Sequence, residues 1–148
     1  MRLTGLVALV LLIATLNLAA CATSESPLPT LYKRLGGREG ISIVVGDFVT
    51  NMAADSRVNA RFKEMKGPQI EKLKSNLADQ ICDATGGPCS YLGRDMKTAH
   101  KGMKISEAEW NATVENLVKA LDKNNVGARS KSELLGALAP MKADIVGQ

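Results

Sequence analysis

The sequence predicts an all-α protein with one folded domain behind an N-terminal leader. Aromatic residues make up only 3% of the 148 residues, and no long run of Val, Ile and Thr suggests a strand. Leu, Ala, Lys and Glu, which favour helices, are abundant. Several segments repeat apolar residues every three or four positions, which is the period of a helix that buries one face. Lys and Arg alternate with Asp and Glu along the chain, so we expect no nucleic-acid partner.

The leader, residues 1–20, has the layout of a secretory signal peptide. A single early cation, Arg2, precedes an apolar run from Leu6 to Leu16. That run is too short for a comfortable membrane span, and small residues follow it. We therefore expect a cleaved leader rather than a transmembrane helix.

The leader ends in the letters LAAC, and this ending resembles the lipobox of bacterial lipoproteins. The resemblance implies cleavage before Cys21, whose thiol then carries a lipid that holds the chain on a membrane. Residues 21–29 are small, polar and proline-bearing, which suits a lipidated tether, and residues 30–148 form the domain. An alanine directly after the cysteine, Ala22, resembles the pattern that sorts lipoproteins to the outer membrane. We therefore expect the protein on the periplasmic face of that membrane. The alternative is an ordinary signal peptide with an incidental cysteine.

The domain begins with a short predicted helix and a long one. Thr30 can cap a helix over residues 31–35, which Gly36-Gly37 ends. A second helix over residues 38–54 is indicated by six apolar residues at helical spacing. These six are Ile41, Val44, Val45, Phe48, Val49 and Met52.

A loop and a third helix follow. Residues 55–67 are expected as a loop, in which Phe62 is the only large apolar side chain. Pro68 suits the first turn of a helix, and Gly86-Gly87-Pro88 ends that helix. Its predicted buried stripe is Ile70, Leu73, Leu77, Ile81 and Ala84. A charged segment poor in apolar residues then leads to His100, the only histidine of the chain.

Two capping boxes predict the last two helices. Ser106 to Glu109 begins a helix whose inward residues are Trp110, Val114, Leu117 and Leu121. Ser130 to Glu133 is expected to begin the final helix, which Pro140 should kink. Its inward residues are Leu134, Leu135, Leu138, Met141 and Ile145.

Four stretches of this chain together look like a group I truncated haemoglobin: LYKRLGGREGISIVVGDFV, Phe62 in its loop, ATGGPCSYLGRDMKTAHKGM and ELLGALAPMKADIV. The resemblance covers roughly residues 30 to 146, and both glycine pairs match the glycine motifs of that family. It implies a truncated globin, a two-over-two helical sandwich around one haem b (iron protoporphyrin IX). His100 would then be the metal ligand on the proximal side of the iron.

The same resemblance assigns the distal side of the pocket. Phe48 and Phe62 fall on two family aromatics that pack against the haem. Val49 occupies a position that is often a tyrosine, which donates a hydrogen bond to bound oxygen. Leu73 and Leu77 would face the iron, and glutamine is common among relatives at the second of these positions. We therefore expect weak retention of oxygen.

Further cofactor-binding candidates follow from position. Gln80, one turn beyond the residues that would face the iron, is the nearest polar side chain, although a haem-edge or solvent-facing role fits it as well. A methionine four residues before a helical histidine lies on the same helix face, so it packs against the same neighbour as the histidine. The proximal candidates are Met96, Ala99, Ile105 and Trp110.

Cys82 and Cys89 form a candidate disulfide. Seven residues of continuous helix rise about 10 Å, which is too far for the bond. The glycine pair at 86–87 breaks the helix, so the chain can fold back, and an exported protein meets oxidising conditions. The alternative, one buried thiol and one loop thiol, stays open.

The predicted function is reversible binding of oxygen or another diatomic gas, such as nitric oxide or carbon monoxide, through the haem iron. Nitric oxide detoxification in the manner of a dioxygenase would need an external reductase, because the sequence has no GxGxxG motif for a flavin or nicotinamide. One alternative is a membrane-anchored lipoprotein that holds haem or transfers electrons. Another is a globin-derived interaction module without haem.

Overall fold

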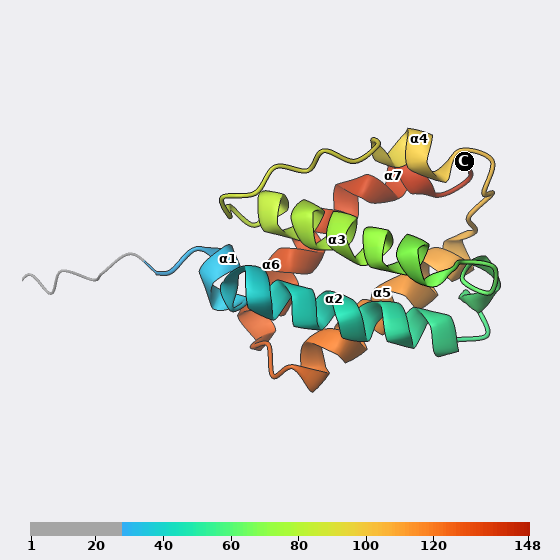
Figure 1. The fold of residues 1–148 in the computed structure, drawn as a ribbon. Helices are drawn as coiled ribbons and strands as arrows, with labels where there is room; N and C mark the ends of the chain where they lie inside the picture. Colours follow the sequence, from blue (N-terminus) through green and yellow to red (C-terminus); the bar gives the residue numbers. More distant parts are fainter. Residues whose placement is uncertain (1–27) are drawn as a thin grey trace, which may run out of the picture.

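The computed structural model describes residues 28–148, which fold into helices joined by short connections (Figure 1). The predicted signal peptide and Cys21 lie outside these residues, as does most of the predicted tether. Within residues 28–148, none of the helices has the length and apolar character needed to cross a membrane. The predicted all-α class is confirmed.

The first two helices meet at a tight turn. Helix α1 (Leu31–Arg34) begins at Thr30, whose hydroxyl accepts a hydrogen bond from a backbone N–H of the first turn. Helix α2 (Gly37–Ala54) follows after the glycine pair. A side chain at Gly40 would place its Cβ 2.1 Å from the carbonyl oxygen of Leu35, so this turn requires glycine there. All six apolar positions predicted for the buried face of α2 are buried.

The predicted loop contains one turn of 3-10 helix, η1 (Asn59–Arg61), and ends at α3 (Gly67–Ala84), with Pro68 in its first turn. Ala78 and Ile81 of α3 are buried in the core. Of the predicted stripe, Ile70, Leu73 and Leu77 are only partly buried, and Leu73 and Leu77 border a cavity instead of a neighbouring helix. Ala84, the last residue of α3, is exposed, so its place in the buried stripe was predicted wrongly, and Ala78 is buried instead.

A short helix and a long one come next. Helix α4 (Met96–His100) has only five residues, and α5 (Glu107–Lys123) has seventeen. The capping box predicted for α5 is confirmed in both directions. The Ser106 hydroxyl accepts a hydrogen bond from the Glu109 N–H at 3.2 Å, and the Glu109 carboxylate accepts one from the Ser106 N–H at 2.8 Å.

The second predicted capping box is wrong. Helix α6 (Ala128–Leu138) begins after Gly127, so Ser130 lies inside the helix, where it is buried and accepts a hydrogen bond from Arg34 Nε at 3.2 Å. The predicted interruption at Pro140 is present. A 3-10 turn, η2 (Ala139–Met141), separates α6 from α7 (Lys142–Ile145).

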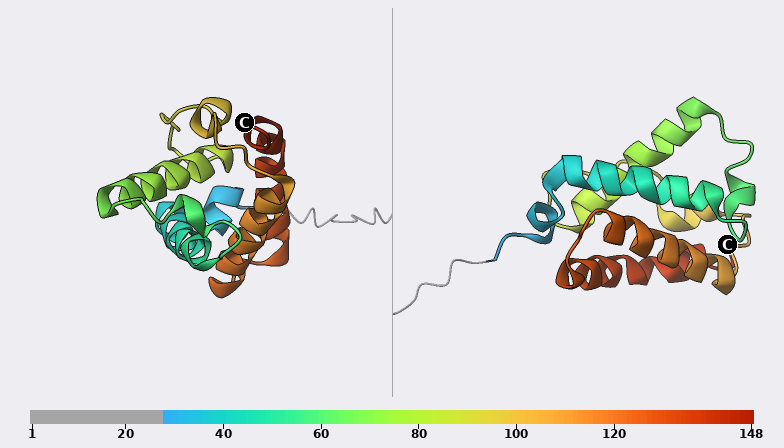
Figure 2. Two further views of the ribbon diagram at one scale, coloured as in Figure 1. Left: turned by 90° about the vertical axis from the view of Figure 1, so that its right-hand side faces the viewer. Right: turned by 90° about the horizontal axis from the view of Figure 1, so that it is seen from below.

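The long helices form two layers. Helix α2 packs against both α3 and α5, and α6 packs against α1 and α5. Figure 2 shows the α2–α3 pair on one side and the α5–α6 pair on the other. Helix α4 lies above α3 and beside α7 (Figure 1). This is the predicted two-over-two arrangement, and α4 forms a cover over one part of it.

Candidate functional site

A cavity of about 440 Å³ lies between α2, α3, α4 and α5, and its walls are mostly apolar. Its volume falls in the range of pockets that bury most of a cofactor-sized ligand. Nine residues were assigned to this pocket from the sequence, and the structure brings all nine to its lining. They are Phe48, Val49, Phe62, Leu73, Leu77, Met96, His100, Ile105 and Trp110. Ala99, the remaining proximal candidate, lines it too.

His100 lines this cavity. Its Nδ1 lies 2.8 Å from the backbone carbonyl oxygen of Met96. A carbonyl can only accept, so Nδ1 carries the proton and donates it, and the neutral ring then has its lone pair on Nε2. A hydrogen bond of this kind fixes the tautomer and orientation of an imidazole that binds a metal.

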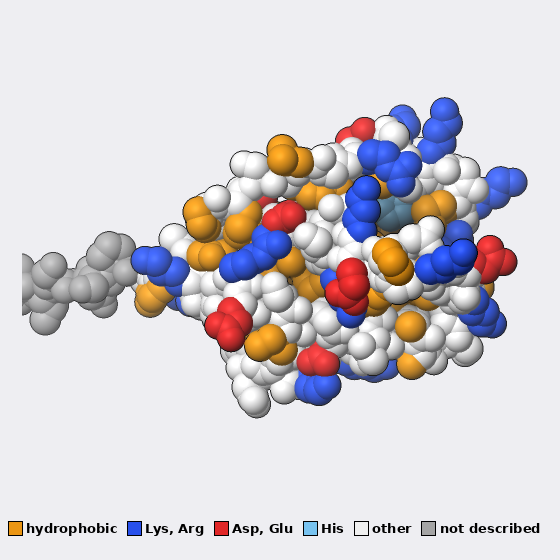
Figure 3. Space-filling model, in the orientation of Figure 1, with side chains coloured by type: hydrophobic (Ala, Val, Ile, Leu, Met, Phe, Trp, Pro, Cys, Tyr) orange, Lys and Arg blue, Asp and Glu red, His pale blue; other side chains and the backbone are white. Residues whose placement is uncertain are grey.

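The short helix α4 places His100. Asp95 caps its N-terminus by accepting a hydrogen bond from the Thr98 N–H at 2.9 Å. The side chain of Thr98, and next its backbone N–H, lower the pKa of the Asp95 carboxyl. Gly102, with φ of +79°, turns the chain away two residues after the helix ends at His100. Figure 3 shows the histidine at the bottom of a hollow that Lys and Arg side chains border.

The wall opposite His100 is apolar at the positions predicted to face the iron. Val49 is 3% exposed, and Leu73 and Leu77 line the cavity beside it. Gln80 also lines the cavity, but its amide nitrogen lies 3.2 Å from the Met96 sulfur and 3.5 Å from the sulfur of Met141. Its amide group is therefore engaged by thioethers at the junction of α3 and α4.

Methionine is unusually common in the lining. Five methionines fall within residues 28–148, and four of them line the cavity: Met52, Met65, Met96 and Met103. Their unbranched, polarizable side chains adapt to an irregular apolar object and make favourable contacts with aromatic faces. The lining therefore suits a large aromatic ligand.

Three polar residues at the mouth, Arg61, Arg94 and Glu109, were missed from the sequence. Arg61 and Glu109 form an ion pair at 2.9 Å across it, and the pKa of Glu109 is lowered, chiefly by the backbone N–H of Ser106. Arg94 also lines the cavity. Tyr91 donates its hydroxyl proton to the Arg94 carbonyl oxygen at 2.8 Å, and burial raises its pKa. Helical periodicity cannot find such residues, because most of them lie in connections.

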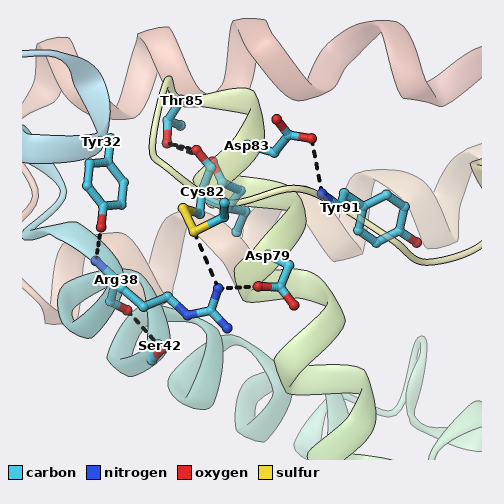
Figure 4. The surroundings of a disulfide bond; sticks show 10 residues. Tyr32, Arg38, Ser42, Asp79, Cys82, Asp83, Thr85 and Tyr91 are labelled. Atoms are coloured by element: carbon cyan, nitrogen blue, oxygen red, sulfur yellow. Dashed lines mark hydrogen bonds and ion pairs between the residues drawn. A yellow bond between two sulfur atoms is a disulfide. The ribbon is translucent and has the colours of Figure 1, made fainter.

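Cys82 and Cys89 are joined by a disulfide, with their Cα atoms 5.8 Å apart (Figure 4). Gly86, with φ of +78°, turns the chain back after α3, and a side chain at Gly87 would collide with the Cys82 sulfur at 2.5 Å. Arg38 donates hydrogen bonds toward Asp79 and toward the Cys89 sulfur, the second at 3.6 Å. The bond ties the end of α3 to the connection that leads to α4.

Reduction of this disulfide should destabilise the folded chain without haem by about 2 kcal/mol, since the crosslink closes a loop of only about eight residues. Urea unfolding with and without a thiol reductant measures the change as a shift in midpoint. A Cys82→Ala/Cys89→Ala variant is the control and should be indifferent to the reductant. An unchanged midpoint for the wild-type chain would contradict the expectation.

The residues around the cavity fit a haem. They supply one imidazole with a free Nε2, aromatic and thioether walls for a flat apolar ring, and cationic side chains at the mouth for its carboxylates. Across residues 28–148 no cluster of three His, Cys, Asp or Glu side chains could hold a bare metal ion. The single imidazole therefore suits a metal whose other ligands belong to a cofactor, as they do in haem.

Comparison with known proteins agrees with this geometry. The bacterial-like globin family matches residues 30–146. A group 1 truncated hemoglobin of Mycolicibacterium paratuberculosis is 32% identical over 116 residues, which cover 78% of this chain and 83% of that protein. A group 1 truncated hemoglobin of Tetrahymena thermophila is 29% identical over 120 residues, covering 81% and 97%.

Solved structures give the same result. Truncated hemoglobin from Tetrahymena pyriformis in its Fe(III) form superposes with a TM-score of 0.75 at 28% identity, covering 81% of this chain and 100% of that one. The 2/2 hemoglobin of a Synechococcus species gives a TM-score of 0.72 at 27% identity, covering 80% and 98%. The cavity with its single histidine thus lies in a known fold, and the chain belongs to the bacterial-like globin family.

Proposed function

We propose that this chain is a haem protein that binds a diatomic gas, with His100 as the only protein ligand of the iron. Family membership implies haem as the cofactor, and the cavity residues fit it. The observation that carries the proposal is the Nδ1 hydrogen bond of His100 to Met96, which leaves Nε2 for the metal. With one histidine in the chain, no second imidazole would compete with a gas for the iron.

The haem supplies an iron at which oxygen, nitric oxide or carbon monoxide coordinates. The surrounding residues set its environment. Phe48, Phe62 and Trp110 would exclude water from the ring faces, and Arg94 would offset the charge of the haem carboxylates at the mouth. Val49, Leu73 and Leu77 offer no hydrogen-bond donor to the gas.

The apolar distal wall favours ligands that do not need a donor. Oxygen draws electron density when it binds and is retained by a hydrogen bond, whereas carbon monoxide and nitric oxide depend less on one. We therefore propose fast release of oxygen and comparatively strong binding of the other two gases. Conversion of nitric oxide is part of the proposal only with an external reductase.

Export and lipid anchoring remain proposals. The LAAC sequence before residue 22 supports them. The disulfide between Cys82 and Cys89 adds support of a different kind, because such bonds persist in exported proteins and are rare in the reducing cytosol. The proposed location is the periplasmic face of the outer membrane.

The second candidate is a haem-holding or electron-transfer lipoprotein in which gas binding is incidental. The apolar distal wall is the observation that favours it. A single protein ligand argues against it, because an open coordination position changes its ligand when the iron changes charge, and this reorganisation slows electron transfer.

Gas titrations of the haem-loaded ferrous protein test the proposed function. We expect stoichiometric changes in the absorption spectrum with carbon monoxide and nitric oxide, and with oxygen a rapidly reversible change. A nitric oxide electrode, with oxygen and a generic reductant present, then separates the two candidates. Catalytic consumption supports gas chemistry, whereas absent gas binding to a fully haem-loaded protein would leave only the electron-transfer candidate.

A further inference from the structure

The mouth of the haem cavity is ringed by cations, and we propose that this ring is the docking site of an acidic electron-donor protein. We name the ring the basic rim and define it by six residues: Lys66, Lys72, Arg94, Lys97, Lys101 and Lys104. All six are exposed, and none forms an ion pair with another residue of the described chain. The inference rests on the proposed haem site and adds the class of partner that serves it.

The rim residues lie next to the lining of the cavity along the chain. Arg94 lines the cavity itself, and each of the five lysines is the chain neighbour of a lining residue. Lys97 follows Met96 in this way, and Lys101 follows His100. Figure 3 shows the resulting Lys and Arg side chains around the hollow in which the histidine is seen. A protein that binds there comes within short range of the haem edge.

Charge is strongly segregated toward this mouth. Residues 61–74 and 91–104 together contain nine Lys and Arg but only three Asp and Glu. The rest of residues 28–148 contains nine Lys and Arg against eleven Asp and Glu. Two carboxylates of a haem would offset only part of this excess. The alternation noted along the sequence therefore hides a one-sided surface that attracts an anionic partner.

An exposed apolar residue lies within the rim. Leu92 is 92% exposed, and it lines a second cavity together with Lys72 and Arg94. That cavity adjoins the main one, because Leu73, Asn76 and Arg94 line both. A small apolar contact surrounded by charge suits a weak, short-lived complex between redox proteins.

The rim lies far from the point where the N-terminal segment leaves the fold. That point is at α1, beside the start of α2, whereas η1 follows the end of α2. Helix α2 has eighteen residues, so its ends are about 27 Å apart. Figure 1 shows the N-terminal side and the α4 region toward opposite ends of the molecule. A tether attached at α1 leaves the rim free for a protein partner and does not require a membrane surface there.

The proposed step is the transfer of one electron. The reduced donor would give up one electron to the ferric haem iron, which would become ferrous, and neither a group nor a proton would pass between the two proteins. The donor must be a one-electron carrier with an acidic surface, such as a reduced flavin protein. Electrostatic steering by the rim would raise the rate at which the donor associates with this protein by one to three powers of ten at low salt.

The test compares two double charge reversals in the full-length chain, loaded with haem in a non-ionic detergent. Lys72→Glu/Lys97→Glu changes the rim, and Lys33→Glu/Lys119→Glu changes two exposed lysines elsewhere by the same total charge. The probe is reduced flavodoxin, an acidic one-electron donor. Its binding to the ferric protein is measured by calorimetry, and its reduction of the haem is measured by stopped flow at low and high salt. Dithionite reduction and the haem absorption spectrum show that the haem site itself is intact.

We expect the rim variant to be reduced by flavodoxin roughly tenfold more slowly at low salt, with weaker binding and a flatter salt dependence, while the control stays within about twofold of the wild-type chain. Equal rates and affinities for the two variants would overturn the proposal. So would a rim variant that binds flavodoxin normally but loses binding to phosphatidylglycerol vesicles or to a single-stranded oligonucleotide. A variant without a haem spectrum would instead indicate failure of the haem site.

Discussion

His100→Ala should abolish stoichiometric haem binding. The wild-type chain reconstituted with haemin is expected to give an intense Soret band and, after reduction, the spectrum of a five-coordinate ferrous haem. The variant would lack the imidazole that we propose as the iron ligand, and the apolar walls cannot replace it. An absorbance titration with haemin, for wild type and variant in parallel, measures the difference.

The fold should survive this substitution, which makes the result interpretable. His100 is half-buried at the end of a five-residue helix and is not part of the buried core. Far-ultraviolet circular dichroism of both proteins without haem checks this. Lys101→Ala, at an exposed neighbouring position, is the matched control and should bind haem fully. Added imidazole should partly restore the band of His100→Ala, because the cavity then holds a free ligand. An unchanged Soret band in His100→Ala would show that another residue holds the iron.

Val49→Tyr should slow oxygen dissociation roughly ten- to a hundredfold. The position faces the cavity from α2, and tyrosine would bring a hydroxyl to a wall that has no donor there. A hydrogen bond to a partly charged acceptor is worth about 1.5–3 kcal/mol, and about 1.4 kcal/mol corresponds to a factor of ten. Stopped-flow displacement of oxygen by carbon monoxide measures the rate.

Val49→Phe separates the hydroxyl from the bulk of the ring. It adds nearly the same volume to the cavity without a donor, so its oxygen dissociation rate should stay near that of the wild-type chain. The dissociation rate of carbon monoxide should change little in either variant. Equal rates for Val49→Tyr and Val49→Phe would mean that position 49 does not face the bound gas.

Much of the fold could be predicted because its signals are local. The apolar face of α2 is set by the spacing of residues within eighteen positions, and the start of α5 is set by the reciprocal bonds of Ser106 and Glu109. Gly36 and Gly86 end α1 and α3 through their own backbone conformations, because both have a positive φ. Each signal depends on neighbours in sequence and so survives without knowledge of the fold.

The failures depend on distant partners. Ser130 has the sequence context of a helix cap. Its hydroxyl instead accepts a hydrogen bond from Arg34, ninety-six positions away, where α1 packs against α6. The pairing of Cys82 with Cys89 depended on the path of the chain after Gly86, which spacing alone left open. The basic rim combines two segments whose charges look ordinary when each is seen alone.

The candidate site was predictable through resemblance, and the reason is again physical. A single histidine at the end of a short helix does not by itself predict an iron ligand. Its spacing in sequence from the second glycine pair does, because that spacing resembles the family pattern. The nine assigned residues converge because the family fold places them there. Arg61, Glu109 and Arg94 escaped because the mouth of a pocket tolerates many polar arrangements.

The methionine-rich lining also makes the pocket sensitive to oxidation. Peroxide attacks thioethers, and the product, methionine sulfoxide, is polar and chiral. Oxidation of Met52, Met65, Met96 or Met103 would therefore place a polar group against the ring faces and loosen the cofactor. Methionine oxidation would therefore accumulate in the pocket over time. How long the protein keeps its cofactor would then depend on repair by sulfoxide reductases as well as on the stability of the fold.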